Sequence, residues 1–205
     1  MTKIVDYGMG NCGSIKNMFR YLGIDAEIIT RADDLKTAKT IVLPGVGAYD
    51  HGVKHLEPFK SVLEEKVLTD KTPFLGICLG MQLLLQGSDE GTLPGLGWIP
   101  GHAKRFDFSG LNKLAVPHMG WNEVYPSEHS KLLPKLPEGY ERFYFAHSYH
   151  AIDVPKENIM ASSHYGYEFV CAIQKGNIMG VQFHPEKSHK FGKAMFSRFV
   201  GMSQC

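Results

Sequence analysis

One cysteine stands where an apolar run would turn sharply into a helix. Cys78 lies between Gly76 and Gly80 in residues 73–82, PFLGICLGMQ. The apolar residues before it predict a buried strand, and the residues after it have the composition of a helix start. Flanking glycines permit a strained turn that presents a nucleophile, and the N-terminus of a helix would favour its thiolate. We therefore expect a reactive cysteine, with a small buried core residue as the alternative.

A thiol nucleophile needs a base, and the base needs a partner that orients it. Of the ten histidines, only His184 ends an apolar strand and has a carboxylate, Glu186, two residues further on. Residues i and i+2 of an extended backbone face the same side, so Glu186 would hold one tautomer of His184 and stabilise its imidazolium. The alternative interpretation is a surface ion pair in a loop.

Two glycines around Val46 predict a second component of such a site. Residues 44–47, PGVG, follow an apolar run, and their flexible backbone could point N–H groups into a cleft as an oxyanion hole. A plain turn between a strand and a helix is the alternative. In a parallel sheet both Gly47 and Cys78 would lie at the carboxyl ends of strands, where ligands bind.

Strands and helices alternate over the first 87 residues and give way to short strands beyond Gly87. This order predicts one α/β domain, residues 1–205, with a mostly parallel mixed sheet, helices on both faces and added antiparallel strands. Helices are expected at 14–22, where Ser14 could be the cap, within 49–68 and at 190–200. Strands are expected at 3–7, 26–30, 40–43, 74–77, 97–99, 103–106, 122–125, 142–146, 159–162, 169–174 and 178–183.

Composition narrows the function. The 205 residues include 22 basic and 21 acidic ones, a net charge of +1 that gives no reason to expect nucleic acid or an anionic membrane as a partner. No apolar run approaches the roughly 20 residues that span a bilayer, and the N-terminus shows no signal peptide. Cysteines at positions 12, 78, 171 and 205 have neither metal nor disulfide spacing, so we expect no metal and a reducing cytoplasm.

Together these motifs resemble the class I, triad-type glutamine amidotransferases. The resemblance rests on residues 44–47, on 76–82 (GICLGMQ) and on 183–188 (FHPEKS). Within the class, the chain is most similar to the glutaminase subunits of imidazole glycerol phosphate synthases. That similarity rests on residues 6–11 (DYGMGN), 117–122 (PHMGWN) and 147–149 (HSY).

The resemblance implies roles for individual residues. Cys78 would attack the side-chain amide of L-glutamine, form a thioester and release ammonia, with His184 and Glu186 completing a triad that needs no cofactor. The oxyanion would be bound by the backbone of Leu79 and of Val46 or Gly47. The amino-acid end of glutamine would be held by Gln82, Ser148 and Tyr149.

The resemblance also implies a partner, because free ammonia is mostly protonated near neutral pH and must be channelled. That partner is a (β/α)₈-barrel cyclase, which makes imidazole glycerol phosphate and AICAR in histidine biosynthesis. We further expect the free chain to be nearly inactive until the partner rearranges the backbone at Val46. Matching interface positions are Asn11, Trp121, Tyr144, His147 and Lys187. Core packing is the alternative for Trp121 and Tyr144, and an ion pair with Glu186 is one for Lys187.

Two stretches depart from the histidine branch, residues 12–18 (CGSIKNM) and 189–192 (HKFG). Both are similar to paralogues found with surface-polysaccharide genes, which are thought to supply ammonia for amidination of a sugar. The glutaminase of anthranilate or aminodeoxychorismate synthase is a weaker rival, because it usually carries histidine where Met81 stands. A free-standing cysteine hydrolase and an inactive regulatory module are the remaining alternatives.

Overall fold

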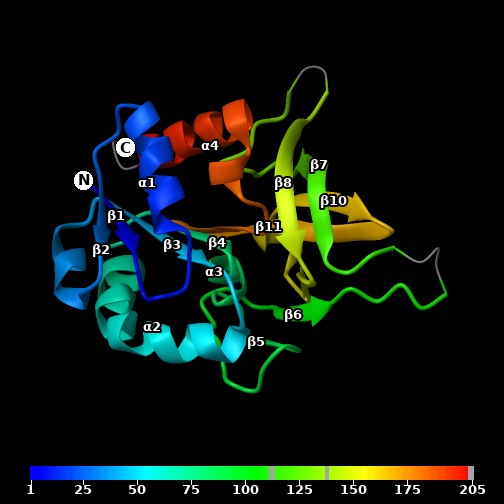
Figure 1. Cartoon of the computed structure of the whole chain (residues 1–205), viewed down its shortest axis with the longest axis horizontal. Helices are drawn as coiled ribbons and strands as arrows, with labels where there is room; N and C mark the ends of the chain where they lie inside the picture. Colours follow the sequence, from blue (N-terminus) through cyan, green and yellow to red (C-terminus); the bar gives the residue numbers. More distant parts are fainter. Residues whose placement is uncertain (111–113, 137–138, 203–205) are drawn as a thin grey trace.

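A single extended sheet runs through the molecule with helices packed on both of its faces. The computed structural model describes residues 1–110, 114–136 and 139–202. Figure 1 shows α1 (Cys12–Tyr21) and α4 (His189–Gly201) over one face and α2 (Tyr49–Glu64) over the other. This arrangement is the predicted mixed α/β architecture, which is confirmed.

One half of the sheet is parallel. Its order is β2-β1-β3-β4-β12, and its registers place Gly45 beside Cys78 and Ile77 beside Val181. These strands carry almost unbroken apolar runs because helices cover both of their faces. The strands are β1 (Thr2–Val5), β2 (Ala26–Ile29), β3 (Thr40–Gly45), β4 (Phe74–Cys78) and β12 (Ile178–Val181).

The sheet continues in antiparallel order as β12-β11-β10-β7-β8. A side branch pairs β9 antiparallel with β11 and β6, and β6 pairs in parallel with the short β5. These strands are β5 (Gly87–Ser88), β6 (His102–Arg105), β7 (His118–Pro126), β8 (Glu141–His147), β9 (Tyr149–Ile152), β10 (Ile159–Tyr165) and β11 (Tyr167–Lys175). The strand expected at 97–99 is wrong, since Gly97 has a φ of +65° and the chain turns there while Trp98 packs edge-on against Phe74.

The helices differ from the expectation at three places. Asn11, not Ser14, caps α1: its Oδ1 accepts the backbone N–H of Ser14 at 3.2 Å. The helix after the cysteine, α3 (Leu79–Gln82), is a single turn, because Leu83 and Leu84 leave it to pack in the core. The second predicted helix continues past α2 through a π-helical turn, Glu65–Thr69.

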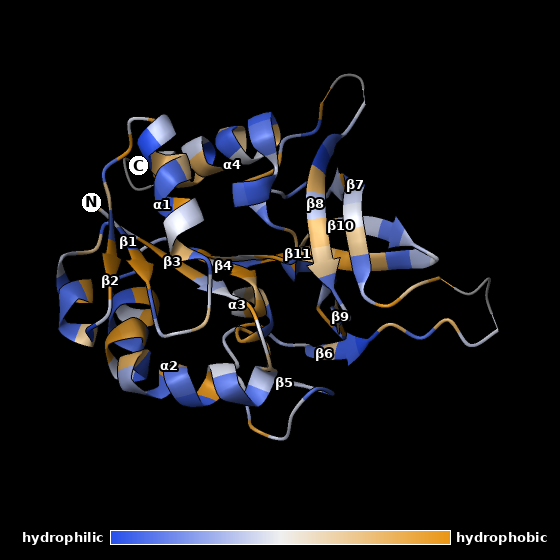
Figure 2. Ribbon diagram, in the orientation of Figure 1, coloured by the Kyte–Doolittle hydropathy of each residue, from blue (hydrophilic) through white to orange (hydrophobic). Residues whose placement is uncertain are grey.

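Two hydrophobic cores lie on opposite faces of the sheet. One contains the buried faces of α1 and α4, including Phe19, Phe196 and Phe199, and the other contains Leu56 and Leu63 of α2. Figure 2 shows the apolar strands between these helices, whose outer faces are hydrophilic. No helix among the described residues is long and apolar enough to cross a membrane.

Candidate active site

Cys78 occupies a strained backbone conformation at the end of β4. Its φ of +56° and ψ of −111° lie in a region that residues with a Cβ rarely adopt. Two glycines make this turn possible, because a Cβ on Gly76 would collide with the backbone of Gly80, and a Cβ on Gly80 with the carbonyl oxygen of Leu43. The predicted elbow is therefore present, and it is packed directly against β3.

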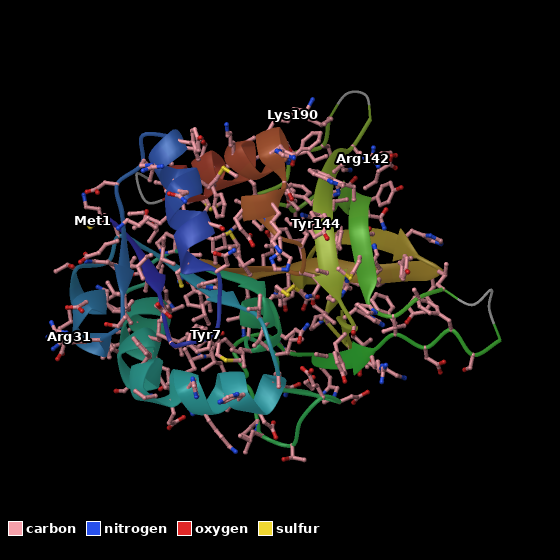
Figure 3. The ribbon with its side chains drawn as sticks, viewed as in Figure 1. Met1, Tyr7, Arg31, Arg142, Tyr144 and Lys190 are labelled. Carbon is pink, nitrogen blue, oxygen red and sulfur yellow. The ribbon has the colours of Figure 1, made fainter. Side chains whose placement is uncertain are left out.

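His184 and Glu186 form a buried pair in the loop that leads into α4. Nδ1 of His184 lies 2.8 Å from Oε1 of Glu186, and the two side chains are 4% and 2% exposed. With Nδ1 donating to the carboxylate, Nε2 of His184 is left for the thiol. The backbone is held by Tyr144 on β8 (labelled in Figure 3), whose carbonyl accepts the N–H of His184 at 2.8 Å. Ser188 adds a bond from its Oγ to the carbonyl of His184 at 2.6 Å.

His184 also interacts with Cys78 through a hydrogen bond and through charge. Burial lowers the pKa of His184, but hydrogen bonds to Cys78 and Glu186 outweigh it and raise the pKa to about 10. A proton therefore stays on the imidazole near neutral pH when the sulfur beside it is a thiolate. The arrangement suits proton exchange between a thiol and an imidazole that is oriented by a carboxylate.

A cavity of about 280 Å³ opens over Cys78. It brings together residues that are far apart in the sequence, from the turn after β3, from α3 and from the turn between β8 and β9. Eight of the predicted site residues contribute to its lining, together with three that were not predicted. The lining is Val46, Gly47, Cys78, Leu79, Gln82, Glu90, Pro117, Ala146, His147, Ser148 and Tyr149.

The expected oxyanion positions all line the cavity over Cys78. Leu79 is buried and begins α3 directly after Cys78, whereas Val46 is 45% exposed in the turn after β3. Gly47 has a φ of +115°, and a Cβ there would press on the methyl group of Met9. Only a glycine fits this turn, which leaves the backbone of residues 46 and 47 at the cavity.

Glu90 is a cavity residue that the sequence did not single out. It belongs to the loop after β5, and its Oε2 accepts the backbone N–H of Tyr49 at 3.1 Å. Burial raises the pKa of Glu90, and the bond from Tyr49 partly offsets this. Glu90 and Gln82 line the cavity together with Ser148 and Tyr149.

Interface candidates divide into exposed and buried positions. Trp121 is 39% exposed, and its ring stacks on His189 at 5.5 Å with planes 5° apart. Lys187 is exposed, with Nζ 5.7 Å from the ring centre of Tyr144, and it forms no ion pair with Glu186. Tyr144 itself is half-buried.

The other two candidates have structural partners within the chain. His147 is 4% exposed and lies beneath the cavity, not on the outer surface. Its Nδ1 is 2.7 Å from the carbonyl oxygen of Tyr149, and its Nε2 is 3.0 Å from Nδ1 of His118. Asn11 is exposed, but its side chain is used as the cap of α1.

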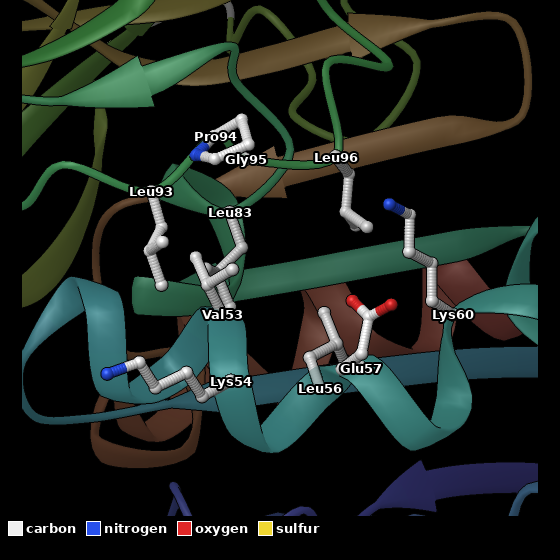
Figure 4. A pocket seen from close by; sticks show the side chains of 10 residues that line it. All are labelled: Val53, Lys54, Leu56, Glu57, Lys60, Leu83, Leu93, Pro94, Gly95 and Leu96. Carbon is white, nitrogen blue, oxygen red and sulfur yellow. The ribbon is translucent and has the colours of Figure 1, made fainter.

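Two further hollows lie away from the sulfur. One, of about 350 Å³, is an apolar groove between α2 and the loop at 93–96, and Figure 4 shows Lys54, Glu57 and Lys60 along it; it contains none of the candidate residues. The other, of about 440 Å³, lies between the starts of α1 and α4 and reaches Glu186. Its lining includes Ser14, Asn17, Met18, Lys187, His189, Lys190 and Lys193.

The residues that the structure describes include three buried cysteines and no cluster that could hold a metal ion. Cys12, Cys78 and Cys171 are all buried and unpaired, and burial raises the pKa of Cys12 to about 11 and that of Cys171 as well. Within residues 1–110, 114–136 and 139–202 no group of three or more His, Cys, Asp or Glu side chains could hold a metal ion. Cys78 is the cysteine that meets a histidine and a cavity; Cys205 lies outside the described residues.

Comparison with known families agrees with this geometry. The family described as glutamine amidotransferase class-I matches residues 3–202. The chain belongs to the class I glutamine amidotransferases. It is therefore an enzyme of that class, and the predicted family is confirmed.

Individual relatives narrow the branch. The chain is 49% identical to imidazole glycerol phosphate synthase subunit HisH 2 of Methanococcus maripaludis, over 98% of each chain. It is 48% identical to subunit HisH of Bdellovibrio bacteriovorus, over 97% of this chain and 98% of that one. Within the amidotransferases it therefore belongs with the HisH subunits.

Solved structures support the fold. A crystal structure described as glutamine amidotransferase superposes with a TM-score of 0.77 at 16% identity, covering 100% of this chain and 99% of the other. The structure of PurLQS from Thermotoga maritima superposes with a TM-score of 0.75 at 18% identity, covering 98% and 97%. At these identities the likeness concerns the fold alone.

Proposed function

We propose that this amidotransferase is the glutaminase subunit of an imidazole glycerol phosphate synthase. It hydrolyses L-glutamine at Cys78 and passes ammonia to a cyclase subunit, which forms imidazole glycerol phosphate and AICAR. The observation that carries the proposal is the cavity in which a strained cysteine, backed by a buried His–Glu pair, meets the polar residues Gln82, Glu90 and Ser148. The acceptor reaction rests on the names of the HisH relatives.

The chemistry assigns one task to each triad member. The thiolate of Cys78 bonds to the amide carbon of glutamine while the carbonyl electrons move to oxygen. When this intermediate collapses, His184 gives its proton to nitrogen, the C–N bond breaks and ammonia leaves. His184 then accepts a proton from a water molecule whose oxygen attacks the thioester, which releases glutamate and the thiolate. Glu186 holds the imidazole in the required tautomer throughout.

Developing charge on the carbonyl oxygen would be met by backbone N–H groups of Leu79 and of Val46 or Gly47. One such donor is worth about 10²- to 10³-fold in rate. Because Val46 is exposed and Gly47 adopts a positive φ, this side of the hole can rearrange at little steric cost. We infer that a partner sets this backbone, so that the free chain turns over glutamine slowly.

Recognition of the substrate follows from the polar residues that line the cavity. The carboxylate of Glu90 and the side chain of Gln82 suit the α-ammonium group of glutamine. The segment Ser148–Tyr149 also lines the cavity and suits the α-carboxylate. It is anchored where the carbonyl of Ser148 accepts the N–H of Phe106 at 3.0 Å. The reacting amide is thereby directed toward Cys78.

The partner is proposed to be a (β/α)₈-barrel cyclase, which docks over the exposed face around Trp121 and Lys187. That face combines an exposed aromatic stack with the basic hollow between α1 and α4, which suits an acidic, partly apolar surface. We infer a reducing, cytoplasmic setting from the unpaired cysteines of the described residues.

The decisive experiment is Cys78→Ala in the assembled synthase, assayed with glutamine and separately with an ammonium salt. Glutamine-supported synthesis should fall by more than about 10³-fold, while ammonium-supported synthesis persists because the cyclase is untouched. Glutamine-supported synthesis at the wild-type rate would refute the proposal. Assaying the chain alone tests the partner's role: turnover equal to that of the complex would refute activation.

A second candidate acceptor is a sugar of a surface polysaccharide. The observation favouring it is that the two divergent stretches, 12–18 and 189–192, meet at the basic hollow on the proposed docking face. A changed docking face would accompany a changed partner. Expressing this chain in a histidine auxotroph that lacks the glutaminase subunit separates the two candidates. Growth without histidine supports the histidine pathway. Failure to grow, together with an amidinated sugar product, supports the second candidate.

A further inference from the structure

A second buried amide touches the nucleophile. Gln182 directly follows β12, is 0% exposed, and places its Nε2 3.7 Å from Sγ of Cys78. Its Oε1 accepts Nε2 of Gln82 at 3.2 Å, and its backbone N–H donates to Cys171 at 2.8 Å. Gln182 directly precedes the motif at residues 183–188, and the sequence pattern alone suggested no role for it.

The two side-chain contacts define the direction of the hydrogen bonds. Because Oε1 of Gln182 accepts from Gln82, its NH₂ group faces the sulfur. Reversing the amide of Gln182 alone would place its NH₂ against the NH₂ of Gln82, and these two donors repel each other. It would also place an acceptor oxygen against the sulfur, which is repulsive when Cys78 is a thiolate.

Burying the amide of a glutamine at this position destabilises the fold unless the amide forms hydrogen bonds. It is fully buried beside Val181 and Phe183, which are also 0% exposed, and an apolar side chain would avoid the desolvation of an amide. Hydrogen bonds to a charged group are worth more than those between neutral groups, so an N–H donor has its largest effect on an anionic sulfur.

We propose that Gln182 is a further catalytic residue, whose side-chain N–H stabilises the thiolate of Cys78 and whose oxygen orients the amide of Gln82. With its Nε2 bonded to Gln182, Gln82 presents its own oxygen to the cavity as an acceptor for the ammonium group of the substrate. This inference rests on the proposed glutaminase function. It links the residue that binds glutamine to the atom that attacks it.

The test compares Gln182→Met with the wild type in the assembled synthase. Methionine has similar length and lacks the N–H donor, so the pH midpoint for alkylation of Cys78 by iodoacetamide should rise by about one unit. His184 and Tyr7 also face Cys78 electrostatically and stay unchanged in this variant. For glutamine, kcat should fall about tenfold or more, and ammonium-supported synthesis should persist.

Gln174→Met is the matched control. Gln174 is also a buried glutamine, but its side chain bonds to the backbone of His129 and Lys131. This control should lose stability without moving the alkylation midpoint of Cys78. A second variant, Gln182→Glu, keeps the shape and places an oxygen against the sulfur, so the midpoint should rise further than in Gln182→Met.

The inference is overturned if a folded Gln182→Met or Gln182→Glu enzyme keeps the alkylation midpoint of the wild type and a kcat within twofold of it. That outcome differs from failure of the proposed function. If Cys78→Ala abolishes glutamine-supported synthesis while the Gln182 variants change nothing, the function stands and only the role of Gln182 is lost. If Cys78→Ala changes nothing, the proposed function itself is lost.

Discussion

The buried histidines near Cys78 and the cavity have pKa values shifted in opposite directions. His184, 3% exposed, has a pKa raised to about 10, whereas His118 and His147, 3% and 4% exposed, have pKa values lowered to about 4 and about 3. Burial lowers the pKa in all three cases. The difference is the neighbours, because His184 meets the side chains of Cys78 and Glu186.

The neutral pair belongs to a directional chain of hydrogen bonds. Nδ1–H of His147 donates to the carbonyl of Tyr149, so its Nε2 accepts from Nδ1–H of His118. Nε2 of His118 in turn accepts from Nδ2 of Asn122 at 3.3 Å. A proton added to either imidazole would break this order. Neutral histidines thus position the cavity edge, and a charged one does the chemistry.

Removing the charged member should have the largest effect. His184→Gln deletes both the general base and the cation beside the sulfur, so kcat for glutamine should fall by about 10³- to 10⁴-fold. Ammonium-supported synthesis by the complex is the control and should be unchanged. Steady-state assays with the two nitrogen sources measure this directly, and a loss below tenfold would contradict the role of His184.

Removing the carboxylate of Glu186 should lower the pKa of His184 toward those of His118 and His147. In Glu186→Gln one contributor to the raised pKa of His184 is lost, so the alkaline limb of the pH–rate profile should move down from about 10. We expect kcat to fall by about 10²-fold near neutral pH. The profile of kcat against pH between 6 and 10.5 measures both; an unmoved alkaline limb would argue against the pair.

The neutral pair should make the fold sensitive to acid. The pKa values of His118 and His147 in the folded chain lie below the ordinary value of 6.5, so the unfolded chain binds more protons. Their contribution to stability is complete above pH 6.5 and is lost as the pH falls toward 4, at about 1.4 kcal/mol per unit for each histidine. Urea titrations at several pH values measure this slope, and His118→Gln should flatten it.

The smallest effect is expected at Asn122, the outer member of this series of hydrogen bonds. Asn122→Leu removes the donor to His118 and to the carbonyl of His164, which lies 2.8 Å from Nδ2. The free energy of unfolding should drop by about 1 kcal/mol, and KM for glutamine should rise a few-fold because Tyr149 is held less firmly. A matched Trp121→Leu variant, one residue away, should alter binding of the partner and leave KM in the isolated chain unchanged.

The sequence predicted the features that steric rules dictate locally. Glycines at 76 and 80 mark the elbow because no side chain fits there. His184 and Glu186 meet as expected, but across the 3-10 turn Pro185–Lys187, because the strand expected to reach residue 183 ends at Val181. The alternation of strands and helices then predicted the parallel half of the sheet. Each of these signals is contained within a few residues.

Features that depend on distant partners could not be predicted in this way. Glu90 reaches the cavity through a loop whose position depends on Tyr49, and Gln182 acquires its role from Gln82, a hundred positions away. A polar residue inside an apolar run was the one local sign of Gln182. The cap at Asn11 was missed because serine and asparagine have similar capping preferences.

The contact between Gly80 and the carbonyl of Leu43 has a consequence for how activation would be detected. It joins the elbow to β3 up to Gly45, which pairs with Cys78, so a rearrangement of the oxyanion turn is confined to the few residues that follow. So small a change would leave circular dichroism and small-angle scattering profiles unaltered. Nitrogen-15 resonances of Val46 and Gly47, recorded with and without the partner, would report it.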